Sequence, residues 1–174
     1  MALLDFIMIL TQKEILKEIS QKRVKIFPFS KKAVGPASID LTLDSTIRIF
    51  TTKEVVEISE NTNYEDITIR KKIGKGYILK PGELILGITK EKITLPEDIC
   101  GWLNSRSRFA RIGFMSHITA PFIAPGVSNH QVLEIFNAGP LHIKLIPHRK
   151  VCQLILQRCE GKAKYTGKFK NQKL

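Results

Sequence analysis

The chain is poor in cysteine: its three cysteines, Cys100, Cys152 and Cys159, are an odd number and form no CxxC pair. Neither a disulfide framework nor a zinc knuckle is therefore indicated, and a reducing cytoplasm is the expected compartment. No apolar run reaches the roughly 18 to 20 residues that a membrane span requires, since the stretch 3–10 is interrupted by Asp5. We expect a soluble protein that has no membrane partner.

Motifs of several common enzyme classes are also missing. The sequence contains neither H-x-E with P-C-x-x-C nor H-E-x-x-H, so zinc-dependent deamination or hydrolysis is not indicated. It also lacks G-x-x-x-x-G-K-[ST] and G-x-S-x-G, which argues against P-loop and α/β-hydrolase chemistry. The histidines lack metal-ligand spacing and are interpreted as strand or turn residues: His117, His130, His142 and His148.

Aromatic residues are few and basic residues are many. Aromatic side chains make up 7% of the chain, with Trp102 as the single tryptophan, while 28 Lys and Arg against 16 Asp and Glu give a net charge of +12. This charge predicts attraction to a phosphorylated small molecule, a nucleic acid or an acidic surface. Because few rings could stack on bases, nucleic acid is the least favoured partner.

Short β-rich runs dominate the chain, whose 174 residues correspond to one domain. A capping-box pattern, Thr11 followed by Glu14, predicts a short N-terminal helix. Many short strands between Gly, Pro and Asn turns indicate an all-β sandwich, barrel or jelly roll. The last dozen residues are expected to be mobile unless a ligand orders them. The predicted strands cover residues 24–27, 38–43, 46–50, 55–58, 67–69, 77–79, 84–89, 99–103, 114–118, 131–136, 141–146 and 152–157.

Two features could carry chemistry. The guanidinium and hydroxyl groups of residues 105–113 suit phosphate oxygens, although an exposed basic turn explains this segment equally well. Glu134 lies between apolar residues, where a carboxylate is costly to bury unless it is paired or serves acid–base chemistry. Strand alternation offers the alternative that Glu134 faces water, and the residues alone slightly favour that alternative.

Segments in collinear order resemble the dCTP deaminase family of the trimeric dUTPase superfamily. They are residues 36–43 (PASIDLTL), 81–87 (PGELILG) with Thr89 and Glu91, 105–113, 117–120 (HITA) and 132–139 (VLEIFNAG). The resemblance begins at about Met8 and runs to Lys168. It implies a distorted jelly roll of the dUTPase-like, β-clip type over residues 8–160. Residues 1–7 would be an N-terminal extension, and residues 161–174 a basic tail that closes over the nucleotide.

The resemblance further implies zinc-independent deamination of dCTP to dUTP and ammonia by a homotrimer, with sites at subunit interfaces and Mg²⁺ carried on the triphosphate. Glu134 would shuttle protons, Ser107 and the Ala120 carbonyl would position water, and Arg111 would support the site electrostatically. The nucleotide-binding residues that it implies are Arg106, Ser107, Arg108, Phe109, Ala110, Arg111, Ala124, Val132, Leu133, Glu134, Lys164 and Lys168.

Several positions depart from the family pattern. Ala124 stands where the family usually has an Asp that helps order water for diphosphate release, and Phe122 stands where deaminases often carry Arg. Arg108 replaces the commoner Ser, and Lys168 replaces a tail Gln. Deamination is the leading hypothesis, and dUTP diphosphatase activity, alone or coupled to deamination, is the alternative. A non-catalytic nucleotide-binding protein is a third hypothesis.

Overall fold

The computed structural model describes residues 8–51, 55–172 and 174, so the extension expected at residues 1–7 lies outside the described residues. Within them, two α-helices, two 3₁₀ turns (η) and the strands alternate along the chain. Their order is α1 (Gln12–Ser20), β1 (Lys25–Phe27), η1 (Lys31–Ala33), β2 (Ile39–Phe50), η2 (Tyr64–Ile67), β3 (Thr68–Lys72), β4 (Tyr77–Leu79), β5 (Leu84–Thr94), β6 (Ile99–Ser105), α2 (Ser107–Ala110), β7 (Phe114–Met115), β8 (Phe122–Ile123), β9 (Ser128–Asn137), β10 (Ile143–Leu145) and β11 (Lys150–Arg158).

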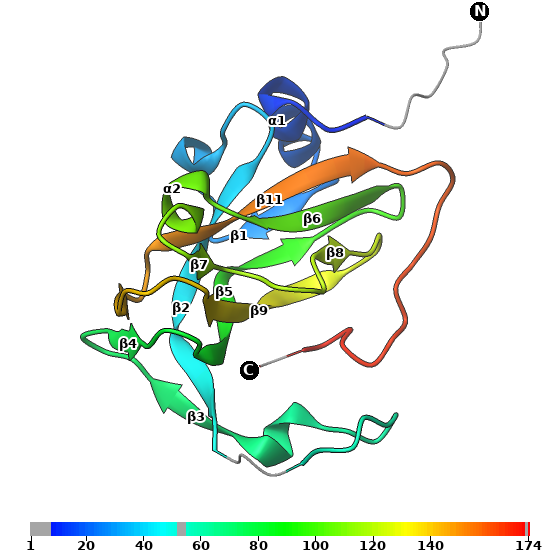
Figure 1. Cartoon of the computed structure of the whole chain (residues 1–174). Helices are drawn as coiled ribbons and strands as arrows, with labels where there is room; N and C mark the ends of the chain where they lie inside the picture. Colours follow the sequence, from blue (N-terminus) through cyan, green and yellow to red (C-terminus); the bar gives the residue numbers. More distant parts are fainter. Residues whose placement is uncertain (1–7, 52–54, 173) are drawn as a thin grey trace, which may run out of the picture.

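One curled antiparallel sheet forms the body of the molecule (Figure 1). Its main path of hydrogen-bonded neighbours is β7-β9-β5-β2-β11-β6-β8, while β1 pairs with β5 and β3 pairs with β2. Strands β4 and β10 form a separate two-stranded ribbon. Helix α1 lies at one end of the sheet, near β11 (Figure 1). The predicted all-β fold with a short N-terminal helix is therefore confirmed.

Alternating side chains build the hydrophobic core. In β2, Ile39, Leu41 and Leu43 are buried, whereas the residues between them are partly exposed. This alternation arises because successive side chains of a strand point to opposite faces of the sheet. In β9, Leu133 and Ile135 are buried in the core, and Glu134 between them projects from the other face.

Helix α1 confirms the predicted N-terminal helix, but the predicted capping box is wrong. Thr11 is the N-cap residue, and its side chain makes no capping hydrogen bond. Glu14 pairs instead with Lys17 at 3.7 Å and with Arg158 of β11 at 3.9 Å. A cation that arrives from a distant strand thus competes for the carboxylate that a capping box would use.

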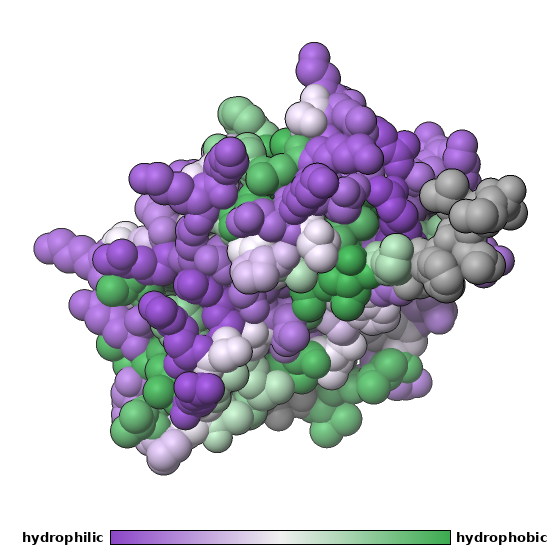
Figure 2. Space-filling model, turned by 90° about the horizontal axis from the view of Figure 1, so that it is seen from above, coloured by the Kyte–Doolittle hydropathy of each residue, from purple (hydrophilic) through white to green (hydrophobic). Residues whose placement is uncertain are grey.

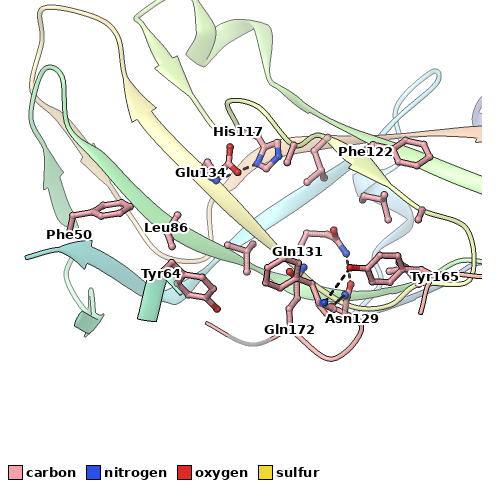
Figure 3. Close-up of a pocket in the computed structure, with 17 residues that line it drawn as sticks. Phe50, Tyr64, Leu86, His117, Phe122, Asn129, Gln131, Glu134, Tyr165 and Gln172 are labelled. Carbon is pink, nitrogen blue, oxygen red and sulfur yellow. Dashed lines mark hydrogen bonds between the residues drawn. The ribbon is translucent and has the colours of Figure 1, made fainter. Parts of the chain in front are cut away.

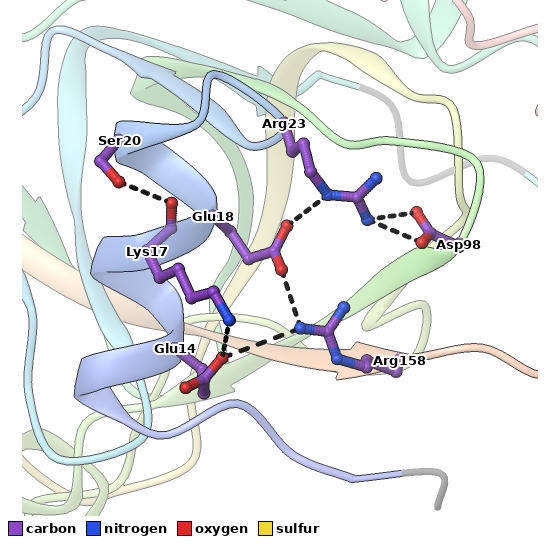
Figure 4. Close-up of polar contacts among 7 residues, drawn as sticks. All are labelled: Glu14, Lys17, Glu18, Ser20, Arg23, Asp98 and Arg158. Carbon is purple, nitrogen blue, oxygen red and sulfur yellow. Dashed lines mark hydrogen bonds and ion pairs between the residues drawn. The ribbon is translucent and has the colours of Figure 1, made fainter. Parts of the chain in front are cut away.

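Glu18 on the same helix joins α1 to the sheet (Figure 4). Its carboxylate accepts hydrogen bonds from Arg23 Nε at 2.7 Å and from Arg158 Nη2 at 2.8 Å. Arg23 also contacts Asp98 at 2.6 Å, which extends the network to the turn between β5 and β6. Burial alone would raise the pKa of Glu18, but the hydrogen bonds and charges of both arginines outweigh it and lower that pKa.

Several predicted strand boundaries differ from the structure. The predicted strands at 38–43 and 46–50 merge into one continuous strand, β2, which begins at Ile39, and the predicted strand at 114–118 ends at Met115. Residues 55–58 form no strand, and Val55 and Ile58 are almost fully exposed because no neighbouring strand covers them. Strand β8 is too short to show the alternation from which strands are predicted.

The C-terminal tail packs against the body, whereas the sequence predicts a mobile segment. In Figure 1 the tail leaves β11 and returns alongside the sheet. The bonds that hold it join Ala163 N to Glu97 O (2.8 Å), Tyr165 N to Pro125 O (3.0 Å), Asn129 Nδ2 to Phe169 O (2.9 Å) and Gln172 Nε2 to His130 O (2.7 Å). The receiving groups are distant in sequence, so composition alone does not reveal them.

The surface agrees with the high content of charged residues in the chain, 25%. Viewed from the side of α1, it is mostly hydrophilic, with smaller hydrophobic patches between the polar side chains (Figure 2). In the part of the chain that the structure describes, no helix is long and apolar enough to cross a membrane.

Candidate active site

A cavity of about 420 Å³ lies beside β9 (Figure 3). Its walls come from β9, from the segment between β7 and β9, from the end of β2 with η2, and from the C-terminal tail. The lining residues are Phe50, Tyr64, Leu86, Leu103, His117, Ala120, Phe122, Ile123, Ala124, Val127, Asn129, Gln131, Val132, Glu134, Tyr165, Phe169 and Gln172. This lining includes one carboxylate, Glu134, and neither Lys nor Arg. We call it the β9 cavity.

Glu134 is held in the β9 cavity by Thr119. The backbone N–H and the hydroxyl of Thr119 both donate to Oε2 of Glu134, each at 3.0 Å. The other oxygen, Oε1, has no hydrogen-bond partner among the described residues. Glu134 therefore does not simply face open water, which was the alternative at the level of sequence, and one of its oxygens is free for a ligand.

His117 lies directly beside Glu134 (Figure 3). Its Nδ1 accepts a hydrogen bond from the backbone N–H of Glu134 at 3.3 Å. Its Nε2 is buried and has no hydrogen-bond partner among the described residues. Its spacing in the sequence predicts only a strand or turn residue, although the HITA segment that supports the family resemblance begins with His117.

Strand β9 presents a backbone edge to the cavity. In an antiparallel strand, alternate residues direct both N–H and C=O to the same edge. The carbonyl of His130 accepts from Gln172 and the N–H of Glu134 donates to His117, so these alternate residues face away from β5. Val132 lies between them in the same alternation and lines the cavity, so its N–H and C=O point to that edge.

Buried amide side chains connect the cavity to the tail. Asn129 and Gln131 are both buried, and Gln131 Nε2 donates to Asn129 Oδ1 at 2.6 Å. Asn129 in turn donates to the carbonyl of Phe169, and the Tyr165 hydroxyl accepts from the Phe169 N–H at 3.3 Å. Residues of the tail thus form part of the wall of the β9 cavity.

The two predicted tail lysines lie outside the lining of the β9 cavity. Lys164 lines an adjoining cavity of about 540 Å³ between the tail and residues 122–125, where Ala124 and Phe122 also lie. Lys168 is exposed and lines neither of these two cavities. Phe122 packs against Trp102 with ring centroids 5.0 Å apart, so an aromatic pair stands where the family resemblance leads us to expect an arginine.

The segment rich in serine and arginine folds as one helical turn, α2, on another part of the protein. Arg106 precedes this turn, contacts Asp40 at 3.2 Å and donates to the carbonyl of Lys150 at 3.0 Å. Arg106, Arg108 and Phe109 line a second cavity of about 590 Å³, which shares no lining residue with the β9 cavity. We call it the α2 cavity.

The structure therefore divides the predicted site residues. Ala120, Ala124, Val132 and Glu134 come together in the β9 cavity, while Arg106, Arg108 and Phe109 lie in the α2 cavity. Ser107, Ala110 and Arg111 are exposed and line neither cavity. The side chain of Leu133 is fully buried in the core, and its N–H and C=O face β5, so neither is directed into the β9 cavity.

Charge separates the two cavities as well. The lining of the α2 cavity includes five cationic side chains and no carboxylate, whereas that of the β9 cavity includes one carboxylate and neither Lys nor Arg. Across the described ranges, no group of three or more His, Cys, Asp or Glu side chains could hold a metal ion.

Comparison with known proteins identifies close relatives of the chain. The family model described as dCTP deaminase-like matches residues 9–159. A protein of Parafrankia sp. named "dCTP deaminase, dUMP-forming" is 37% identical over 175 residues, which cover 95% of this chain and 87% of the relative. A protein of the same name from Mycolicibacterium vanbaalenii is 38% identical over 160 residues, covering 91% of this chain and 84% of that one.

Solved structures show the same fold at lower sequence identity. The 2'-deoxycytidine 5'-triphosphate deaminase of Agrobacterium tumefaciens superposes with a TM-score of 0.67 at 21% identity, covering 87% of this chain and 48% of the other. A Staphylococcus bacteriophage 80alpha dUTPase variant gives 0.50 at 14% identity, with 83% and 96% covered. The expected dUTPase-like fold is therefore confirmed.

Proposed function

The chain belongs to the dCTP deaminase-like family, and we propose that it deaminates dCTP hydrolytically to dUTP, releasing ammonia. The observation that carries this proposal is the placement of Glu134. Its carboxylate lies in the β9 cavity next to the backbone edge of Val132, with Oε2 fixed by Thr119 and Oε1 free of protein partners among the described residues.

Glu134 acts first as a base and then as an acid. It takes a proton from water as the water oxygen attacks C4 of cytosine, and it delivers that proton to N3. It next transfers the proton of the new hydroxyl group to the amino group, the C4–N bond breaks, and ammonia leaves. The Ala120 carbonyl of the same chain and Ser107 of a neighbouring subunit position the water, and Arg111 of that neighbouring subunit supports the developing charge. Because Thr119 holds one oxygen, the other remains oriented for these transfers.

The base binds along the open edge of β9. The N–H and C=O of Val132 offer one donor and one acceptor to the edge of a pyrimidine, as a neighbouring strand would. Leu133 contributes by its place next to Val132 rather than by a polar contact, because its side chain is buried and its N–H and C=O face β5. The apolar lining around Ile123 and Val127 excludes water, which strengthens the polar contacts made at this edge.

The phosphates bind to the segment 106–111 of a neighbouring subunit in a homotrimer. This arrangement is supported by the lack of Lys and Arg in the lining of the β9 cavity and by the separate position of the arginines. Lys164 and Lys168 of the tail add positive charge when the tail closes. Mg²⁺ would offset the triphosphate charge, and it would be held by phosphate oxygens, since the cavity lining supplies a single carboxylate.

The product is dUTP because the residue at position 124 cannot orient a second water. Ala124 lines the β9 cavity with a methyl group, and no lining carboxylate other than Glu134 could direct water at the α-phosphate. A second candidate function, formation of dUMP with release of pyrophosphate, is favoured by the names of the relatives.

Product analysis tests both candidates. The purified protein is incubated with dCTP and, separately, with dUTP in Mg²⁺, and nucleotides, ammonia and pyrophosphate are quantified. Ammonia and dUTP from dCTP without pyrophosphate support the proposal, whereas dUMP with pyrophosphate supports the second candidate. No product from either nucleotide would contradict both and leave a binding protein. Sedimentation should give about three times the 19.7 kDa monomer mass.

A further inference from the structure

The α2 cavity has two walls, and the family resemblance accounts for only one of them. Arg106, Arg108 and Phe109 come from the α2 segment. The other wall is the segment that runs from β10 into the start of β11 (residues 143–151), which contributes Lys144, His148, Arg149 and Lys150 to the lining. This β10–β11 segment thus brings three of the five cationic side chains of this cavity, none of which the sequence alone assigns to a site.

Asp40 links the two walls of this cavity. Its two oxygens contact Arg106 Nε at 3.2 Å and Lys150 Nζ at 3.7 Å, so one carboxylate is shared between a cation of each wall. The guanidinium of Arg106 also lies over the ring of Phe109, 5.6 Å from its centroid. These contacts fix the α2 segment and the β10–β11 segment relative to each other before any ligand binds.

The remaining cations are not engaged by the protein. The side chains of Arg108, Lys144 and Arg149 are exposed, and none of them forms an ion pair or hydrogen bond with a described residue. Beneath them lies an apolar floor that includes Phe114 and Leu145, both buried. Three unpaired cations that line one cavity above an apolar floor attract an anion more strongly than a single exposed cation does, because their charges add.

We propose that Lys144 and Arg149 bind the triphosphate of the nucleotide together with Arg108. This inference rests on the proposed function and adds to it a second phosphate-binding wall, supplied by the β10–β11 segment. The triphosphate of dCTP carries several negative charges, and Arg106 is already paired with Asp40. The cations of the β10–β11 segment therefore provide charge that the α2 segment alone lacks. Arg149 can donate hydrogen bonds to two phosphate oxygens at once.

Steady-state kinetics on Lys144→Ala and Arg149→Ala tests the inference. Each variant should raise KM for dCTP roughly tenfold, since a charge-assisted contact is lost, while kcat stays within about twofold because the base and Glu134 are untouched. The matched controls are Lys72→Ala and Arg70→Ala, which remove the same charges from exposed positions on β3. If Lys144→Ala and Arg149→Ala gave the same KM for dCTP as these controls, the proposal would be overturned.

Binding of inorganic tripolyphosphate separates this inference from the proposed function. Titration calorimetry is done on the same four variants, each checked for an unchanged melting temperature. Lys144→Ala and Arg149→Ala should bind tripolyphosphate about tenfold more weakly than the β3 controls do. That result would support the phosphate wall even if the wild-type protein released no ammonia. Equal tripolyphosphate affinity in all four variants would reject the wall even if deamination were confirmed.

Mixed oligomers show whether the β10–β11 segment acts with the α2 cavity of one subunit or with the β9 cavity of its neighbour. We call these two cavities the halves of one site. Coexpression of Glu134→Gln chains with Lys144→Ala/Arg149→Ala chains should restore low-KM sites, because one subunit supplies an intact β9 cavity and its neighbour an intact α2 cavity. Coexpression of the double variant with Arg108→Ala chains should restore none, since both changes lie in the same half. Low-KM sites in the second mixture and none in the first would place the β10–β11 segment in the same half as Glu134 and contradict the proposal.

Discussion

Thr119 donates two hydrogen bonds, one from its backbone N–H and one from its hydroxyl, to the same oxygen of Glu134. The pair fixes the carboxylate at the point where β9 meets the cavity wall. Since both bonds go to Oε2, they leave Oε1 as the oxygen that can exchange protons with a ligand. This relationship gives Thr119 a positioning role in the proposed reaction.

We expect Thr119→Val to lower kcat roughly tenfold, because the hydroxyl contact to the carboxylate is lost while the backbone N–H remains. KM for dCTP should change little, since Thr119 itself does not bind the nucleotide. Thr119→Ser, which keeps the hydroxyl, should recover most of the rate. Initial rates of ammonia release measure both, and equal kcat in the Val and Ser variants would remove the positioning role.

Removing the bonds that hold the tail should loosen it. The Asn129→Ala/Gln172→Ala variant loses two hydrogen bonds between tail and body, so trypsin should cut at Lys168 and Lys170 about tenfold faster or more. Asn171→Ala, at an exposed tail position, is the matched control. Peptide mapping over time follows the cuts, and equal rates in the variant and the control would show that these bonds do not hold the tail.

The network around Glu18 should make stability depend on pH. The pKa of Glu18 is lower in the folded protein than its ordinary value of 4.5, so its contribution is complete above that value and is lost as pH falls through the lowered one. Glu18→Gln should therefore cost about 1 to 2 kcal/mol at pH 7, since both arginines stay partly solvated.

Urea unfolding of the two proteins at several pH values measures this contribution. The gap between wild type and Glu18→Gln should begin to shrink below pH 4.5, where the Glu18 carboxyl of the unfolded chain takes up a proton, and should close as pH falls through the lowered pKa of the folded protein. A gap that is constant from pH 7 to pH 3 would mean that the ion pairs with Arg23 and Arg158 do not stabilise the fold.

Cys159 should be the one cysteine that alkylates readily in the folded protein. Burial, with a hydrogen bond to Cys159, raises the pKa of Cys100 to about 11, and burial raises that of Cys152 to about 11. Only about one part in a thousand of either thiol is then ionised at pH 8, and both are shielded. Iodoacetamide labelling with peptide mass analysis should find Cys159 modified first, with all three modified in urea. Early labelling of Cys152 would contradict its burial.

Local patterns predict the strands best where burial alternates. The run that became β2 shows buried Ile39, Leu41 and Leu43, and its sequence alternates in the same way. The prediction at 55–58 failed because apolar residues there find no partner strand, and Val55 remains exposed. Alternation reports how a strand could bury one face, but the presence of a neighbour depends on the whole topology.

The candidate site was predictable in part for a similar reason. Glu134 stands out because a carboxylate interrupts an apolar strand. Asn129 and Gln172 have no such signal, since their importance arises from hydrogen bonds between segments about forty residues apart, of which the bond from Gln172 to the His130 carbonyl is one. The sequence did not predict that His117 contacts Glu134, because a lone histidine without ligand spacing resembles an ordinary strand residue. The division of the predicted site between two cavities likewise appears only in the folded chain.

The most direct test of the account is the release of ammonia from dCTP by the wild-type protein and by Glu134→Gln, measured in parallel with Mg²⁺ at equal protein concentration. The account predicts steady release by the wild type and none above background by the variant, while the variant still binds dCTP with wild-type affinity. Release of ammonia by Glu134→Gln at the wild-type rate would contradict the role of Glu134 on which the account depends.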